Sequence, residues 1–251
     1  MVRFVLTLFL ILVVPVFAQN GSDSPAGFSS AAAIAPRPAP DGFQWKSALA
    51  QSGLFLGIQH AYRFSDQPYT REAMRGPFLK DYWRSITGLR GWDDGDSVLA
   101  NYVGHPMEGA VAGYIYVHNS PRSLRQEFGM NSAYWSSRLR AMGFAALYST
   151  QYELGPLGEG ALGNVGMTRG TKGAVDLVIT PTLGMAWMVT EDALDKQLIE
   201  RLESKTGNAY VKMILRTGLN PSRTFANLLR FRVPWYRDTR AGVFQRQAHG
   251  R

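Results

Sequence analysis

Large apolar residues recur at helical intervals from Phe43 onward, and this period limits the chain to one class of fold. The repeat is clearest in residues 43–64, where it consists of Trp45, Leu49, Leu54, Ile58 and Tyr62. Such spacing places apolar side chains on one face of a helix, whereas the alternation that marks strands is weak along the chain. The sequence therefore predicts an all-α protein, a single bundle of roughly six to eight helices.

Capping residues and helix breakers divide this pattern into segments. The predicted helices span residues 43–64, 76–88, 96–119, 131–155, 174–205 and 220–233. Parts of three of them, residues 98–117, 141–152 and 177–190, are nearly uncharged around the whole circumference. These parts should form the centre of the bundle or lie in lipid. None is a clean run of about twenty apolar residues, and the mean hydropathy of −0.14 argues against a polytopic membrane protein.

The first eighteen residues have the three parts of a secretory signal peptide. A short basic start precedes the apolar run "FVLTLFLILVVPVF", and "VFA" offers a cleavage site before Gln19. An uncleaved anchor helix is the alternative. Residues 19–42 are rich in Ser, Ala, Pro and Gly, which predicts a disordered linker. We therefore expect an exported protein on the periplasmic side of a bacterial membrane.

The chain contains no cysteine. This excludes disulfide bonds, a thiolate nucleophile, cysteine metal sites and a lipoprotein anchor.

The excess of positive charge lies near the carboxyl end. The formal net charge is +8, and residues 221–251 contain seven arginines against the single acidic residue Asp238. Leucines and aromatic residues are interleaved with the arginines, a pattern typical of segments that bind anionic surfaces. We expect residues 43–219 to form the bundle domain and residues 220–251 to form a basic amphipathic helix and tail. For an exported protein, the expected partner is an anionic membrane surface and not nucleic acid; a solvated tail is the alternative. No feature predicts the oligomeric state.

Two prolines, Pro106 and Pro181, fall inside central helices. Proline lacks an amide proton and disfavours the α conformation of the residue before it, here His105 and Thr180. Each helix should therefore be kinked or divided into two at its proline. Backbone carbonyls one turn earlier, near residues 102 and 177, then need polar side chains or water as partners.

Polar residues gather around these prolines. Asn101, His105 and Glu108 share one helical face, and Asp176 and Thr180 share another. Glu153 ends its helix, and a glycine-rich connection follows it. Small residues at Gly104, Gly109 and Gly113 would let another helix approach His105 closely. The predicted internal cluster consists of His105, Glu108, Glu153 and Asp176, with Glu159 and Asn164 as further candidates.

The chemistry of these residues suggests roles for them. His105, Glu153 and Asp176 are the candidate catalytic residues, because a histidine paired with a carboxylate can act as a general base or acid. The candidate binding residues are Asn101, Glu108, Glu159 and Thr180. Alternatively, His105 is a core histidine that satisfies a freed carbonyl.

A metal ion held by His105, Glu108, Glu153 and Asp176 is a further alternative. The spacing common in helical bundles is Glu-x-x-His from two helices, whereas this chain has His-x-x-Glu once, so no metal site is assigned. The acidic stretch "GWDDGDS" (91–97) does not match a calcium loop and predicts a turn with caps. No phosphate-binding loop or nucleophile elbow is present, and the cofactor stays unknown.

Three blocks carry a resemblance to a known group. They are "NYVGHPMEG" (101–109), "YELGPLGE" (152–159) and "DLVITPTLG" (176–184). In this order they resemble an uncharacterised family of bacterial envelope proteins, with a looser similarity to VanZ-like proteins, over residues 93–195. The resemblance implies an envelope location and a helical fold, and it supplies no activity. The residues it carries over are Asn101, His105, Pro106, Gly109, Glu153, Asp176, Thr180 and Gly184.

Two classes of function fit these observations. The first is a structural or binding protein of the envelope, whose polar cluster fixes the packing of the helices. The second is an enzyme that uses acid–base or metal-assisted chemistry on a lipid or other envelope substrate. A sealed cluster would favour the first class, and a cluster open to a cavity with apolar walls would favour the second.

Overall fold

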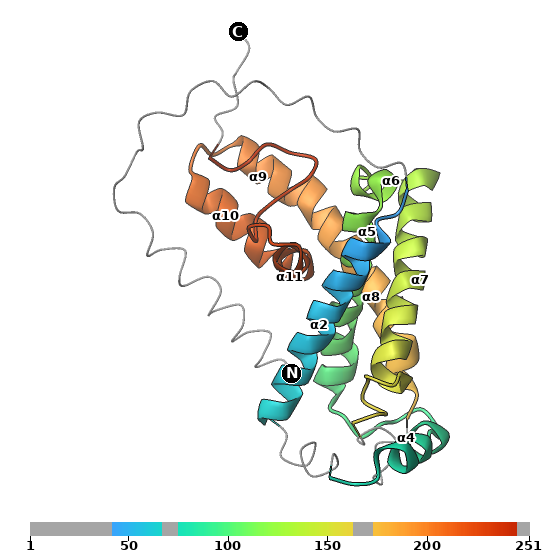
Figure 1. Ribbon diagram of the computed structural model, residues 1–251. Coiled ribbons are helices and arrows are strands. Elements are labelled where there is room, and N and C mark those ends of the chain that lie inside the picture. Colours follow the sequence, from blue (N-terminus) through green and yellow to red (C-terminus); the bar gives the residue numbers. More distant parts are fainter. Residues whose placement is uncertain (1–41, 67–74, 163–172, 245–251) are drawn as a thin grey trace.

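The computed structural model describes residues 42–66, 75–162 and 173–244, and every regular element in these residues is helical. Figure 1 shows a bundle with α4 (Phe78–Thr87) at one end and α9 (Glu200–Ser204) and α10 (Ala209–Gly218) beside the other. The prediction of an all-α bundle is confirmed. The predicted signal peptide, almost all of the predicted linker, and Asn164 lie outside the described residues.

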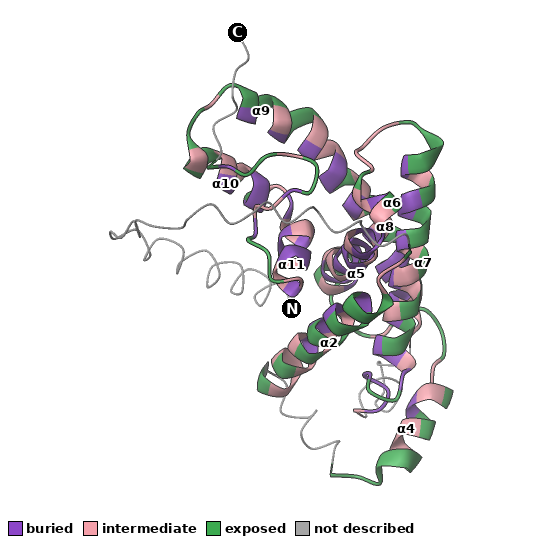
Figure 2. Ribbon diagram, turned by 45° about the horizontal axis from the view of Figure 1, so that its top comes forward, coloured by how far each residue is buried: buried purple, intermediate pink, exposed green. Residues whose placement is uncertain are grey.

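Helix α5 (His105–Asn119) forms the centre of the bundle. It lies among α2 (Trp45–Asp66), α7 (Ser132–Leu154), α8 (Val175–Leu194) and α11 (Pro221–Leu229), and it is buried along most of its length (Figure 2). The shared core consists of Ala48, Phe55, Ala110, Val111, Tyr114, Ile115, Val117, Ala141, Met188, Ala226 and Leu229. Because α5 is mostly apolar around its circumference, contact with four other helices removes most of its surface from water.

Helix α11 belongs to this core. Ala226 and Leu229 are buried in it, so the expected boundary after residue 219 does not separate two packing units. Helix α10 lies outside the predicted helices, although Asn208 accepts hydrogen bonds from the amides of Tyr210 and Val211 as a helix cap does. The short helix α6 (Pro121–Leu124) also lies outside them. In the described residues, no helix is long and apolar enough to cross a membrane.

The chain stays helical through both prolines, with Pro106 in the first turn of α5, as one of the two expected arrangements has it. A π-helical turn, η2 (Ala100–Gly104), precedes α5, and the amide of His105 donates to the carbonyl of Ala100. His105 has φ −61° and ψ −40°, so the prediction that Pro106 moves it out of the α region is wrong. The wider π turn accommodates the missing amide of Pro106 while the chain stays helical. Pro181 likewise lies within the continuous helix α8.

Helices α5 and α8 touch through their backbones. A Cβ atom on Gly109 would lie 1.8 Å from the carbonyl oxygen of Thr180, and one on Gly184 would lie 2.8 Å from the Cα of Gly109. No side chain fits into this contact. The two glycines therefore allow the helices that carry His105 and Asp176 to cross closely.

Replacement of Gly109 by alanine should separate these helices. We expect Gly109→Ala to lower the free energy of unfolding by about 1–3 kcal/mol, the usual effect of excess volume in a packed core. Gly143→Ala is the matched control, because Gly143 lies on α7 with no atom within 4 Å of an added Cβ; it should raise stability by about 0.5–1 kcal/mol. Equal stability of the two variants in urea denaturation would contradict this description of the crossing.

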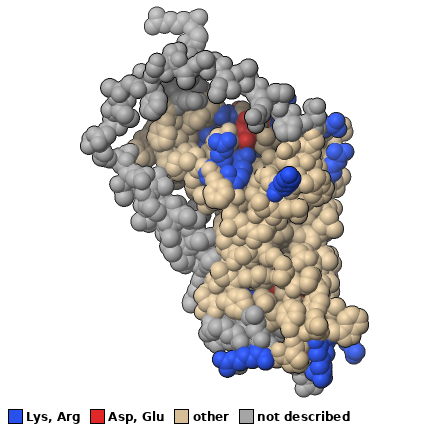
Figure 3. Space-filling view, viewed as in Figure 1, with Lys and Arg blue, Asp and Glu red and all other residues tan. Residues whose placement is uncertain are grey.

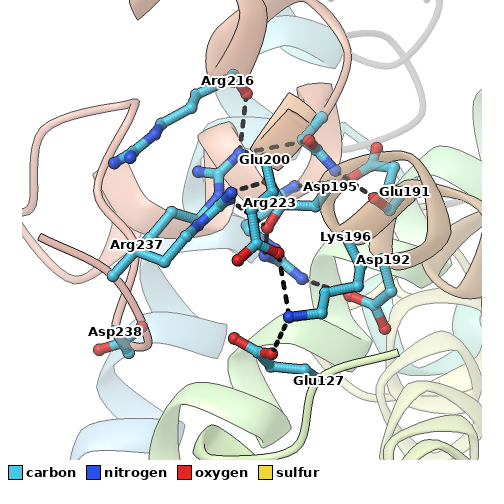
Figure 4. A network of polar contacts seen from close by, with 12 residues as sticks. Glu127, Glu191, Asp192, Asp195, Lys196, Glu200, Arg216, Arg223, Arg237 and Asp238 are labelled. Carbon is cyan, nitrogen blue, oxygen red and sulfur yellow. Dashed lines mark hydrogen bonds and ion pairs between the residues drawn. The ribbon is translucent and has the colours of Figure 1, made fainter. Parts of the chain in front are cut away.

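A network of ion pairs fastens the carboxyl-terminal segment to α8 and to η3 (Asp195–Ile199), the π-helical turn that continues it (Figure 4). Asp195 accepts hydrogen bonds from Arg237 (2.9 Å), Arg240 (2.6 Å) and Arg223 (3.2 Å). Asp192 binds Arg138 at 2.6 Å and also Arg223. The arginines thus come from segments far apart in the sequence and converge on one helix.

The network also organises α11. The carboxylate of Glu191 accepts hydrogen bonds from the amides of Ser222 and Arg223 at 2.9 and 3.1 Å, and so caps the first turn of this helix. Arg230 pairs with Asp238 at 2.7 Å. Four of the seven arginines in residues 221–251, namely Arg223, Arg230, Arg237 and Arg240, are therefore held by carboxylates of the protein itself.

Asp195 should contribute stability that depends on pH. Burial opposes its charge, but Arg223, Arg237 and Arg240 outweigh burial and hold its pKa below the ordinary value of 3.8. A lowered folded pKa gives stability that is complete above the ordinary value and is lost as the pH falls through the folded value. Asp195→Asn should therefore cost about 3–5 kcal/mol at pH 7, because it removes the only carboxylate that pairs with the buried Arg237 among the described residues.

Urea denaturation of the wild type and Asp195→Asn at pH 7 and at acid pH checks this expectation. The difference between the two proteins should shrink in acid. The matched control is Asp96→Asn, at an exposed position, which should stay within about 0.5 kcal/mol of the wild type. A difference that does not change with pH would mean that the arginines do not act through the charge of Asp195.

Candidate functional site

Three helices bring His105, Glu153 and Asp176 together at the end of the bundle near α4. His105 begins α5, Glu153 lies in the last turn of α7, and Asp176 lies in the first turn of α8. All three are buried, with exposed fractions of 5%, 6% and 8%. One nitrogen or oxygen atom from each lies within 4.8 Å of the other two. The structure thus brings together the three residues that the sequence selected as catalytic candidates.

His105 contacts a carboxylate on each side of its ring. Its Nε2 lies 3.1 Å from Oδ2 of Asp176, and its Nδ1 lies 3.4 Å from Oε2 of Glu108. The second separation is long for a hydrogen bond, and Nδ1 lacks a well-aligned partner. Glu108 nonetheless favours the charged form of His105 and raises its pKa. The prediction that Glu108 shares the face of His105 is confirmed.

Asp94 joins the cluster from the acidic turn. The start of α8 is bonded to this turn, because the amides of Ala174 and Val175 donate to the carbonyls of Gly91 and Trp92 at 3.2 and 3.1 Å. The side chain of Asp94 lies close enough to that of Asp176 to raise the pKa of Asp176, and it accepts a hydrogen bond from Nδ2 of Asn101 at 2.8 Å.

The expected turn chemistry of this stretch is present. Oδ1 of Asp93 accepts from the amide of Gly95, and Oδ1 of Asp94 accepts from that of Asp96. The sequence reasoning missed the second role of Asp94, its contact with the cluster. That contact depends on residues about eighty positions away, so no local pattern could have indicated it.

The remaining predicted binding residues take different positions. Asn101 is buried and holds Asp94. Thr180 is buried one turn after Asp176. Glu159 forms an ion pair with Arg63 of α2. Glu159 thus ties the connection after α7 to α2 and is not one of the three residues whose ligand atoms converge.

Acidic groups outnumber basic groups in the cluster, and the pKa values of His105, Glu153 and Asp176 are raised. Burial raises the pKa of Asp176 to about 9 and that of Glu153 to about 7, although His105 opposes both shifts. For His105, burial opposes the charged form, but Glu108, Asp176 and Glu153 outweigh burial and raise its pKa to about 9. Protons therefore compensate part of the buried negative charge.

Several buried polar atoms around the cluster have no hydrogen-bond partner. They are Oδ1 of Asn101, Nδ1 of His105, Oδ1 of Asp176 and Oγ1 of Thr180. Such atoms are costly to bury without a partner. Three of the four are oxygens, which are donors of electron pairs to a cation.

The arrangement fits a metal ion. An imidazole nitrogen and two carboxylate oxygens converge from three helices. Glu108 stands behind the other nitrogen of His105, the position from which a second carboxylate orients a metal-binding histidine. The sequence offered no support for a metal site because it was searched for a local Glu-x-x-His spacing. The ligands instead come from three separate helices.

No protein family, curated protein or solved structure matches this chain.

The raised pKa values predict how the stability of the metal-free protein depends on pH. Asp176 and Glu153 have ordinary values of 3.8 and 4.5, and His105 has 6.5. A raised folded pKa gives stability that is present at low pH and is lost as the pH rises through the folded value. The free energy of unfolding should therefore decrease as the pH rises from about 4 to about 9.

Comparison with Asp176→Asn tests this dependence, because the variant removes the most strongly shifted acid. With chelator present, the wild type should lose at least about 1.4 kcal/mol more than the variant between pH 5 and pH 8, the equivalent of one pKa unit. Chemical denaturation at several pH values measures the difference. Parallel curves for the two proteins would mean that Asp176 ionises normally in the fold.

Proposed function

We propose that this chain is an exported, membrane-associated helical protein of the bacterial envelope whose cluster of His105, Glu153 and Asp176 binds a divalent metal ion. The observation that carries the metal site is the convergence of three ligand atoms within 4.8 Å of one another, each on a different helix. One ion placed among them would join α5, α7 and α8. The envelope location rests on the predicted signal peptide and on the resemblance of the three sequence blocks.

The charge of the cluster supports a cation. Asp94, Glu108, Glu153 and Asp176 surround the single histidine. A divalent ion would neutralise carboxylates that otherwise need protons, and it would give Oδ1 of Asp176 a partner. The mixture of imidazole and carboxylate ligands suits zinc, iron or manganese better than calcium or magnesium, which prefer oxygen ligands throughout.

The burial of the cluster favours a binding role over an enzyme that acts on a large substrate. All three ligands are less than a tenth exposed. A small ion needs little room, whereas a lipid needs a cavity with apolar walls. We propose that the ion fixes the crossing of the three helices, as structural metal ions do.

Catalysis at the same residues is the second candidate. Structural zinc sites have four protein ligands, whereas three ligands leave a position open for water. A bound metal ion would then lower the pKa of that water and make it a nucleophile for hydrolysis. The three converging ligands favour this candidate; their burial favours the first.

Metal uptake tests the proposal. The purified protein, stripped with chelator and dialysed against Zn²⁺ or Mn²⁺, should take up one ion per chain, measured by elemental analysis. Glu153→Gln and His105→Gln should weaken uptake at least tenfold. The metal should also raise the stability of the wild type by about 2.7 kcal/mol at a hundred times the dissociation constant.

The matched control is Glu200→Gln. Glu200 carries the same side chain, but it pairs with Lys196 on the helix that continues α8, and its side chain is 40% exposed. This variant should bind metal as the wild type does. The metal site would be refuted if the folded wild type took up neither Zn²⁺ nor Mn²⁺. It would also be refuted if Glu153→Gln took up as much metal as the wild type.

A further inference from the structure

Helix α4 presents an apolar face to solvent. Phe78, Leu79 and Trp83 are all exposed, Leu79 by 77% and Trp83 by 65%. The other side of the helix is attached to the bundle, because Ser85 is fully buried and the hydroxyl of Tyr82 donates to the carbonyl of Leu154 at 2.7 Å. The orientation of the helix is thus set by its buried side, and large apolar side chains are left outside.

The neighbouring segment extends this surface. Trp92, Val98, Leu99 and Tyr102 are exposed between α4 and α5, with Tyr102 in the π-helical turn η2. The indole of Trp92 donates to the hydroxyl of Tyr102 at 3.3 Å. The segment is bonded to the start of α8 through the carbonyls of Gly91 and Trp92, so it is held at the same end of the bundle as the cluster. We call α4 and these four residues the aromatic end.

Basic side chains flank the aromatic end. Arg75, Lys80, Arg84 and Arg90 are exposed, and Asp81 is the only acidic residue in 75–90. Figure 3 shows Lys and Arg beside uncharged surface at this end of the molecule. The turn that follows carries the exposed acids Asp93 and Asp96, so the excess of positive charge lies in residues 75–90, with Lys80 and Arg84 on α4 and Arg75 and Arg90 beside it.

We propose that the aromatic end docks on the surface of an anionic lipid bilayer, with Leu79 and Trp83 inserted among the lipid headgroups. Helices that lie in this interface combine Trp, Phe and Leu on one face with Lys and Arg beside it. Tryptophan also prefers the boundary between hydrocarbon and water. This inference rests on the membrane association in the proposed function and names the surface that makes it.

The carboxyl-terminal segment is less suited to the same task. Arg223, Arg237 and Arg240 are occupied by Asp192 and Asp195, and Arg230 by Asp238. Binding of these arginines to lipid phosphates would break pairs that hold the fold together. On α4, by contrast, no carboxylate competes for Lys80 or Arg84 at the distance of an ion pair among the described residues.

Sedimentation with lipid vesicles tests the proposal. The protein without its predicted signal peptide is mixed with vesicles that contain phosphatidylglycerol, or with vesicles of phosphatidylcholine alone. The wild type should bind the anionic vesicles, and salt should weaken the binding. The double variant Leu79→Ser, Trp83→Ser should lose about tenfold or more in affinity, because it removes the apolar side chains that insert.

Two further double variants complete the comparison. Val211→Ser, Ile214→Ser changes exposed apolar residues on α10, away from the aromatic end, and should bind as the wild type does. Lys80→Gln, Arg84→Gln removes charge from exposed positions with little risk to folding, and should reduce binding to anionic vesicles only. Circular dichroism and metal uptake, both expected to be unchanged, show that each variant is folded.

Three results would overturn the inference. The first is that the wild type does not bind vesicles. The second is that both α4 variants still bind vesicles. The third is that the α4 variants lose association of the protein with itself and keep their binding to vesicles. None of these results bears on metal uptake, so the metal site is tested independently. Survival of binding in the α4 variants would assign membrane contact to another surface of the protein.

Discussion

The close crossing of α5 and α8 determines the rest of the structure. At Gly109 and Gly184 the two backbones meet without side chains between them. This contact sets the distance between the helices, and with it the 3.1 Å approach of His105 to Asp176 near the start of each. Because α5 also forms the centre of the apolar core, the packing that stabilises the fold is the same packing that builds the polar cluster.

Two buried groups of charges lie toward opposite ends of the bundle, and they are balanced differently. Near α9, arginines from three segments pair with Asp192 and Asp195. These arginines hold the pKa of Asp195 below its ordinary value. Near α4, carboxylates surround His105 and the pKa values of Asp176 and Glu153 rise instead. In the first group arginines pair with the carboxylates and fasten the chain. The second has a surplus of acceptor atoms, which is why we assign the ligand site to it.

The sequence predicted the all-α fold because helices depend on local periods, and it selected the cluster residues because they lie beside prolines and at helix ends that local patterns mark. Spacing placed Asn101, His105 and Glu108 on one face, and glycines and prolines marked the helix ends. It did not predict the contact of Asp94 or the pairing of the carboxyl-terminal arginines, because these depend on residues far apart in the chain. The conformation of His105 was predicted wrongly, since a proline rule for isolated dipeptides competes here with a π turn that keeps the helix continuous.

The most direct test of the metal site is a crystal structure of the protein soaked in Mn²⁺, with diffraction data recorded so that manganese gives anomalous scattering. The account predicts one strong anomalous peak among Nε2 of His105 and the carboxylate oxygens of Glu153 and Asp176, at about 2.0–2.2 Å from each. The side chains would have to close in by small rotations around that ion. Crystals that show no peak among these three residues, at a manganese concentration that labels other sites, would contradict the central claim.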